Sequence, residues 1–159
     1  MKKAVFPGSF DPPTFGHLNI IERSRTIFDE VHVVIAINRN KHTLFSPEER
    51  FDMLTELTSG WDNVVIALHD SLIVEYARNT GSSVLVRGIR NIHDFMYEFD
   101  VSMTNRALDA GIETVFIPTE QRFFVLNSSA VKEVAAFGGD TSAMAPSIVA
   151  EALRKKFAK

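Results

Sequence analysis

The chain has 159 residues, of which 45% are hydrophobic, so it fits one domain with a substantial buried core. A formal net charge of -3 gives no reason to expect nucleic-acid or membrane-surface binding, and the lack of cysteine excludes disulfides, thiolate metal sites and cysteine nucleophiles. No apolar run approaches the ~18–20 residues that span a bilayer, so we expect a cytoplasmic protein with neither membrane nor nucleic-acid partners.

Short apolar runs and longer helical patterns alternate along the chain. The apolar runs predict strands, which we expect to be covered on both faces because they are nearly continuous in apolar residues. These runs are residues 3–7, 31–37, 63–68, 83–87 and 113–118.

Helices are predicted between and after these strands. The first follows from the helical spacing of Leu18, Ile20, Ile21, Ile27 and Phe28, and the others cover residues 46–57, 71–81, 91–111, 128–139 and 145–159. Ser46 and Glu49 form a capping-box pattern at the start of 46–57, with Pro47 at the first helical position. Gly81 and Gly111 are expected to end their helices. The helix over 91–111 places Ile92, Met96, Phe99 and Met103 on one face.

This alternation predicts an α/β fold with a five-stranded, mainly parallel sheet and helices on both faces, in a single domain over residues 1–159. Ligands of such sheets bind at the carboxyl ends of the strands, near the point where the strand order reverses. The segments expected there are residues 8–11, 38–41, 87–90 and 119–129.

The segment PGSFDPPTFGH (residues 7–17) leads from the first strand into a helix N-terminus, which suits a phosphate group. Gly8 permits close backbone approach, Ser9 adds a hydroxyl donor, and Gly16 lets the chain turn tightly into the helix. His17 can point a ring N–H at the same phosphate oxygens, or it can simply fill a polar loop. Neither G-x-x-x-x-G-K-[ST] nor G-x-G-x-x-G occurs in the chain, so a bound phosphate would use a histidine-based site.

Basic residues follow the second and fourth strands. Arg39, Lys41 and His42 form either a solvated loop or, through Lys41, a phosphate contact. Arg87 and Arg90 flank a glycine after the fourth strand and can clamp phosphates, although they can also be plain surface arginines.

Two further polar groups have open roles. Glu98 lies two turns into the following helix and faces either a base or ribose, or water. Asn127, Ser128 and Ser129 open another helix, as an ordinary N-cap or as a second phosphate-binding helix start.

Together these segments resemble the histidine-signature nucleotidyltransferases, whose motif H/T-x-G-H reads Thr14–Phe15–Gly16–His17 here. Within that superfamily the chain resembles the bacterial phosphopantetheine adenylyltransferases, through FPGSFDPPTFGH, NKHTLFSPEER, VLVRGIR, DFMYE and NSSAVKEVA. The resemblance implies a Rossmann-like fold, a homohexamer and the use of Mg²⁺ with ATP. It also implies the reaction, in which 4′-phosphopantetheine attacks the α-phosphate of ATP directly and in line, giving dephospho-coenzyme A and pyrophosphate.

The resemblance assigns roles by motif. His17 would be the catalytic residue, donating to the α-phosphate, and Ser9 would contact both substrates. The acceptor would be held by Ser9, Lys41, Ile73 and Arg87. ATP would be held by Ser9, Phe10, His17, Gly88, Ile89, Arg90, Glu98, Phe123, Phe124, Val125, Leu126, Asn127, Ser128 and Ser129. No protein ligand for a metal is expected, because Mg²⁺ would be carried mainly by the phosphates of ATP.

Two alternatives remain open at the level of sequence. A related nucleotidyltransferase would act on nicotinamide mononucleotide or glycerol phosphate, and substrate competition would separate these activities. A non-catalytic module would bind ATP without releasing pyrophosphate. The presence of His17, Lys41 and Arg90 argues against such a module.

Overall fold

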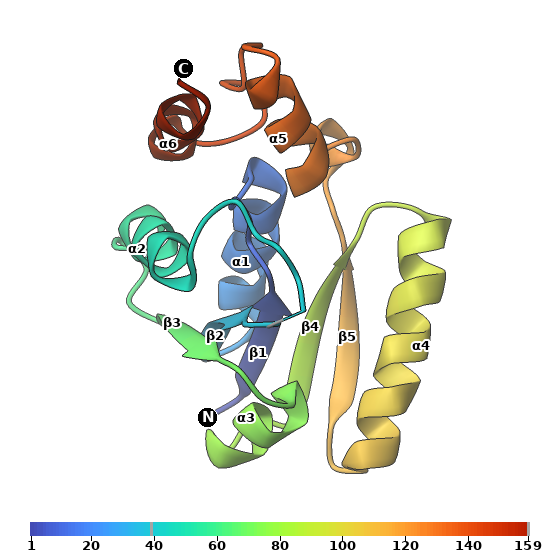
Figure 1. The fold of residues 1–159 in the computed structure, drawn as a ribbon. Helices are drawn as coiled ribbons and strands as arrows, with labels where there is room; N and C mark the ends of the chain where they lie inside the picture. The colour runs from blue at the N-terminus through green and yellow to red at the C-terminus, as the bar shows by residue number, and fades with distance from the viewer. Residues whose placement is uncertain (39, 159) are drawn as a thin grey trace.

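The computed structural model describes residues 1–38 and 40–158 (Figure 1). Arg39, a candidate phosphate contact, lies outside the described residues. In the described part of the chain, five strands form one sheet in the order β3-β2-β1-β4-β5, and every neighbouring pair is parallel. The strands are β1 (Lys3–Gly8), β2 (Glu30–Ala36), β3 (Val64–His69), β4 (Val84–Ile89) and β5 (Glu113–Pro118). The predicted α/β fold is therefore confirmed.

Helices lie on both faces of the sheet, as predicted (Figure 1). They are α1 (Phe15–Ile27), α2 (Pro47–Leu57), α3 (Ile73–Asn79), α4 (Ile92–Leu108), α5 (Ser128–Ala136) and α6 (Ser147–Phe157), with a short 3-10 turn η1 (Gln121–Phe123) that the sequence did not predict. No helix in the described ranges combines the length and the apolar character needed to cross a membrane.

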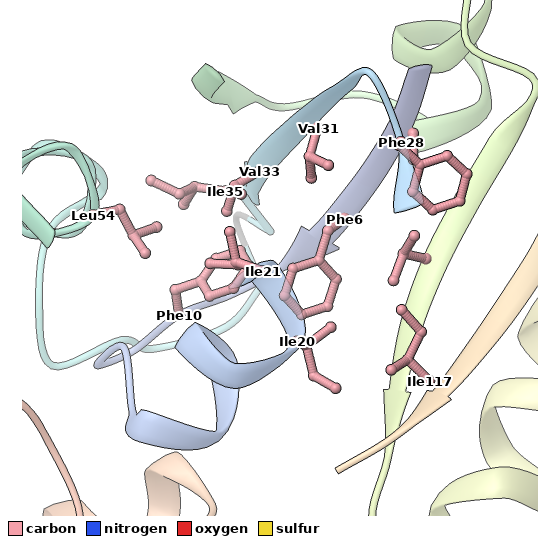
Figure 2. Close-up of a cluster of buried hydrophobic side chains, with 12 residues drawn as sticks. Phe6, Phe10, Ile20, Ile21, Phe28, Val31, Val33, Ile35, Leu54 and Ile117 are labelled. Atoms are coloured by element: carbon pink, nitrogen blue, oxygen red, sulfur yellow. The ribbon is translucent and has the colours of Figure 1, made fainter. Parts of the chain in front are cut away.

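Alternating side chains of β1 build two layers of core, because successive residues of a strand point to opposite faces. Ala4 and Phe6 face α1 and α2, in the cluster of Figure 2, where Ile20 and Ile21 pack against the sheet. Val5 faces α3 on the other side, with Val34, Val74, Ala77, Leu85 and Ile112. α4 covers the same face beside β5, where the rings of Phe95 and Phe116 lie 5.3 Å apart.

A third cluster lies away from the sheet and holds α5 and α6. Phe45, just before α2, is 1% exposed and packs with Met53, Val131, Ala145, Val149 and Leu153. Figure 1 shows α5 and α6 beyond the carboxyl end of the sheet. This packing places the start of α5 above the end of β1.

The edge strands differ from the expectation that every strand is covered on both faces. β1 and β2 have continuous runs of buried residues, but Val65 and Leu68 of β3 are 40% and 37% exposed, and Val115 of β5 is 37% exposed. That expectation is wrong for the edges on both faces of the sheet. Leu68 pairs with Ile35 and Val115 pairs with Val86, so both lie on the face that α1 and α2 cover at its centre. Val65 lies on the other face, where α3 packs on Val5, Val34 and Leu85.

Helix ends follow the sequence in part. The capping box of Ser46 and Glu49 is present, and Gly81 follows α3 with a φ of 71°. α4 instead ends at Leu108, before Gly111, whose N–H donates to the Asp109 carboxylate. The predicted apolar face of α4 is exposed, with Ile92, Met96, Phe99 and Met103 each about half exposed or more.

Candidate functional site

A cavity of about 430 Å³ opens at the carboxyl ends of β1 and β4, the neighbouring strands between which the strand order reverses. The first turns of α1, α4 and α5 contribute to its lining. The predicted site residues that line it are Ser9, Phe10, His17, Arg87, Gly88, Arg90, Glu98, Leu126, Asn127 and Ser128. The structure thus brings together three segments that are far apart in the sequence.

His17 is held by the residue that caps its own helix. The backbone N–H of Thr14 donates to His17 Nδ1 at 3.0 Å, and the Thr14 hydroxyl accepts from the His17 backbone N–H. Because a backbone N–H can only donate, Nδ1 must be the acceptor, and the neutral ring carries its proton on Nε2. The capping box therefore fixes a histidine tautomer with one N–H left to donate.

The surroundings of His17 keep the ring neutral. Burial, and after it the positive charges of Arg90 and Arg87, lower the pKa of His17 from 6.5 to about 4. At neutral pH the ring is therefore an uncharged hydrogen-bond donor. It is not a proton donor under those conditions.

Arg87 is fixed by a carboxylate and a backbone carbonyl. Its Nε and Nη2 donate to the two carboxylate oxygens of Glu98 at 2.5 Å each, and its Nη1 donates to the Pro7 carbonyl at 2.7 Å. This bidentate pair joins β4 to α4 and sets the plane of the guanidinium.

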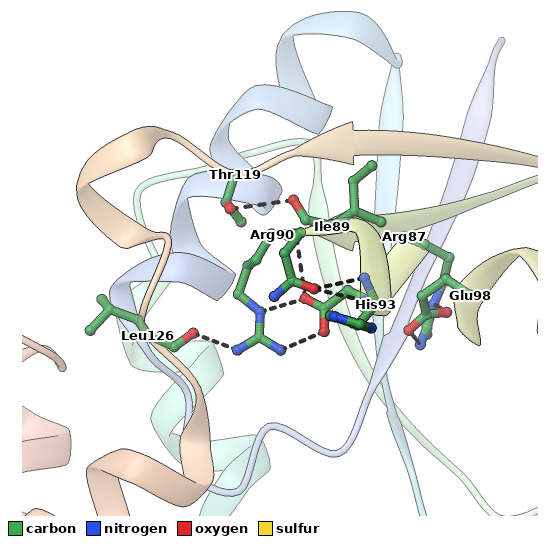
Figure 3. A network of polar contacts seen from close by, with 9 residues as sticks. Arg87, Ile89, Arg90, His93, Glu98, Thr119 and Leu126 are labelled. Carbon is green, nitrogen blue, oxygen red and sulfur yellow. Dashed lines mark hydrogen bonds and ion pairs between the residues drawn. The ribbon is translucent and has the colours of Figure 1, made fainter. Parts of the chain in front are cut away.

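Arg90 is held in a similar way, as Figure 3 shows. Its Nε and Nη2 donate to the Asp94 carboxylate at 2.7 and 3.0 Å, and its Nη1 donates to the Leu126 carbonyl at 3.0 Å. The last bond connects β4 to the segment before α5. Both arginines predicted to clamp phosphates are thus positioned in advance by protein acceptors.

The glycines of the site make room for protein side chains. A Cβ at Gly8 would lie 2.9 Å from the Phe10 ring, and a Cβ at Gly88 would lie 2.9 Å from Ile20 Cγ1. Gly16 is an ordinary helical residue without a positive φ. The chain instead turns at Phe10, whose φ of 48° is rare for a residue with a side chain and points to a constrained, functional segment.

The start of α5 is capped and attached to the first loop. The Asn127 side chain accepts from the Ala130 N–H at 2.7 Å, and the Ser128 hydroxyl donates to the Pro12 carbonyl at 2.9 Å. Ser128 therefore lies against the segment that precedes α1, while Ser129 does not line the cavity.

Several predicted residues lie outside the cavity lining. Lys41 is exposed, and Ile73 packs at the edge of the α3 cluster. The remaining ones are Ile89, Phe123, Phe124, Val125 and Ser129, of which Phe124 and Val125 are 50% and 71% exposed. Their predicted contacts remain predictions.

The lining also contains residues that the sequence analysis did not name individually. Asp94, His93 and Tyr97 come from the first turns of α4, and Thr119 follows β5. The spacing of Arg90 and Asp94 by four residues, across a helix start, was a readable signal. No sequence signal indicated His93 or Tyr97, because the pattern does not show which side of α4 faces the cavity.

In the described part of the chain, no group of three or more histidine, aspartate and glutamate side chains is arranged to hold a metal ion. The two acidic side chains of the lining, Asp94 and Glu98, are already bound to arginines. Their oxygens serve to orient cations of the protein.

The sequence matches a known family and several curated relatives. The family described as cytidylyltransferase-like matches residues 5–134. A phosphopantetheine adenylyltransferase of Treponema pallidum is 50% identical over 98% of this chain and 98% of the relative. Those of Symbiobacterium thermophilum and Caldanaerobacter subterraneus are 48% and 43% identical over 100% of this chain, and the matches cover 98% and 99% of the relatives.

A solved structure shares the fold. A protein of Vibrio parahaemolyticus, provisionally assigned as a nicotinate-nucleotide adenylyltransferase, superposes with a TM-score of 0.73 over 100% of this chain and 98% of that chain. At 20% identity this likeness concerns the fold alone.

Proposed function

The chain belongs to the phosphopantetheine adenylyltransferases, within the cytidylyltransferase-like family, and we propose that the cavity between β1 and β4 is where it joins its two substrates. The enzyme transfers the adenylyl group of ATP to 4′-phosphopantetheine, which gives dephospho-coenzyme A and pyrophosphate in coenzyme A biosynthesis. Residues 1–159 would form one nucleotidyltransferase domain.

The reaction has modest chemical demands. A phosphate oxygen of 4′-phosphopantetheine forms a bond to the α-phosphorus, and the bond from that phosphorus to the bridging oxygen breaks, releasing pyrophosphate. The attacking phosphate is an anion at neutral pH, so no strong general base is required. Bringing anions together and stabilising charge on the α-phosphoryl group is the main task.

The orientation of His17 carries the proposal. Its Nδ1 accepts from the Thr14 N–H, so the free donor is Nε2–H, on a ring that stays neutral at physiological pH. Such a donor can stabilise an α-phosphoryl oxygen throughout the reaction without giving up its proton. Arg87 and Arg90 supply positive charge in the same cavity.

The other substrate contacts are proposed from the resemblance to the family. Lys41, Arg87 and the backbone near Ile73 would hold the acceptor with Ser9, and the ATP-binding segments would be 88–90 and 123–129 with Glu98. Mg²⁺ would enter with ATP, since the acidic groups of the lining are paired with arginines. Both substrates are small metabolites, and we place the reaction in the cytoplasm.

We further propose that the protein works as a homohexamer. The apolar face of α4, formed by Ile92, Met96, Phe99 and Met103, is 46% to 64% exposed in the single chain. A contiguous exposed apolar face of this kind is typical of a contact between subunits.

The test is pyrophosphate release from ATP with 4′-phosphopantetheine, with nicotinamide mononucleotide as the parallel acceptor. We expect release only with phosphopantetheine, and a fall of about 10²-fold or more in turnover for His17→Ala, because one preorganised donor is lost. Turnover of nicotinamide mononucleotide alone would show that the chain has the activity of a related nucleotidyltransferase instead. Binding of ATP without any release would support a non-catalytic role instead.

A further inference from the structure

Asp11 is a buried carboxylate for which the reaction as proposed has no role. It is 4% exposed and directly follows Phe10, the residue at which the chain turns toward α1. It accepts three hydrogen bonds. The donors are the Leu44 N–H at 3.0 Å, the Phe45 N–H at 2.9 Å and the Lys132 ammonium at 2.8 Å.

The partners of Asp11 belong to two other segments of the site. Leu44 and Phe45 end the loop that follows β2, and this loop carries Lys41 three residues earlier. Lys132 lies on α5, whose first residue Ser128 lines the cavity. One carboxylate therefore connects the loop before α1 with the Lys41 loop and with α5.

A neighbouring bond supports the same junction. The Ser128 hydroxyl donates to the carbonyl of Pro12, the residue after Asp11, at 2.9 Å. Arg50 of α2, itself 2% exposed, donates to the Ser9 carbonyl at 2.7 Å. Three residues of the loop before α1, Ser9, Asp11 and Pro12, thus bind the elements on either side of it.

Stability alone does not account for this arrangement. Burial by itself would raise the pKa of Asp11, but the hydrogen bonds from Lys132 and from the Phe45 and Leu44 N–H groups outweigh it and lower the pKa. A buried charged pair is often no more stabilising than apolar residues of the same size, and its strength lies in fixing geometry. Its bonds here fix the relative positions of two loops and α5.

We propose that Asp11 is a positioning residue for adenylyl transfer, which holds the Lys41 loop and the start of α5 in register with His17. The acceptor phosphate would be presented from the Lys41 loop and the nucleotide phosphates from α5. Loss of the carboxylate would then weaken the binding of both substrates. The identity of these substrates rests on the proposed function, but the junction itself does not.

Kinetics of three variants test this role. Asp11→Asn keeps the shape and removes the charge, so we expect the KM values for 4′-phosphopantetheine and for ATP both to rise about tenfold or more, with a smaller fall in kcat. Lys132→Met removes only the α5 connection and should raise the KM for ATP more than that for the acceptor. The control is Asp109→Asn, which likewise neutralises a carboxylate that accepts from a backbone N–H, that of Gly111, and forms an ion pair, with Arg78. It should leave both KM values unchanged.

Hydrogen exchange gives a readout that needs no turnover. In Asp11→Asn without substrates, the amides of residues 41–46 and 127–132 should exchange about tenfold faster or more, while those of β1 and β2 keep their protection. Should Asp11→Asn fail to fold, Lys132→Met carries the same test for α5.

Two results would overturn the role. One is KM values within about twofold of the wild type, and the other is unchanged exchange in both segments. A wild-type protein inactive on phosphopantetheine would remove the proposed function, and the exchange data would still decide whether Asp11 orders the two segments.

Discussion

Two histidines at opposite ends of the sheet are held in different ways. At the amino end of β2, His32 is 7% exposed, and its ring nitrogens lie 2.9 Å from the Tyr76 hydroxyl and 2.7 Å from the Glu30 carboxylate. At the carboxyl end of β1, His17 Nδ1 is bound by Thr14, and among the described residues no hydrogen bond to its Nε2 is found. Cationic residues surround His17, whereas an acidic one contacts His32.

The difference separates a structural histidine from one prepared for a ligand. The partners of His32 satisfy both of its nitrogens, so this ring has no donor or acceptor left for a substrate. The partners of His17 satisfy one nitrogen and leave the other to donate, in a cavity whose lining also holds Arg87 and Arg90. An anionic group such as phosphate completes that arrangement.

Exchanging each histidine for glutamine should give the largest contrast. Glutamine at position 17 keeps a capping-box residue at the third helical position, so the start of α1 is preserved while the imidazole donor is lost. We expect turnover to fall about 10²–10³-fold in His17→Gln and to stay within about twofold in His32→Gln. Steady-state pyrophosphate release measures both. Full activity of His17→Gln would show that His17 acts only as a helix cap.

The acid stability of the protein should depend on His17. Its pKa is 6.5 in the unfolded chain and about 4 in the folded one, so between these values the unfolded state binds the extra proton. The free energy of unfolding should therefore fall as the pH drops from about 6.5 toward 4, with a contribution of about 2–3 kcal/mol from this residue.

Urea unfolding at several pH values measures this contribution. His17→Gln should lose less stability than the wild type over the same range. Parallel curves for the two proteins would contradict a neutral His17 in the folded protein.

The smallest effect is expected at the other histidine. Tyr76→Phe removes the hydroxyl that contacts His32 and keeps the ring that packs against it, with ring centres 5.8 Å apart. We expect the free energy of unfolding to fall by about 1 kcal/mol, the usual contribution of one hydrogen bond, with turnover unchanged. Chemical denaturation with parallel assays checks this. A clear loss of turnover would show that the two ends of the sheet are coupled.

Much of this site could be predicted from local sequence. The apolar runs placed all five strands within one or two residues, and the parallel order then brought Gly8, His17 and Arg87 to one edge of the sheet. Capping patterns identified the starts of α2 and α5 because they involve residues only a few positions apart.

Other features depend on contacts between distant residues. Arg87 meets Glu98 across a strand–helix junction, and Asp11 meets Lys132 over 121 positions, so no local spacing indicates either pair. The exposed side chains of β3 and β5 depend on where the helices of both layers lie. The packing of α5 on the segment around Phe45 likewise arises only once the chain has folded.

The contact between Gly88 and Ile20 has a consequence for mutational studies of this chain. Every substitution at position 88 would drive a Cβ to 2.9 Å from Ile20 Cγ1, whatever the distance from position 88 to ATP. A survey of random variants would score this position as intolerant, and the intolerance alone would look like a substrate contact. The suppressor Ile20→Ala, which removes both γ carbons, would restore such variants if the steric clash is the cause. It would fail to do so if Gly88 also gives ATP access to the backbone.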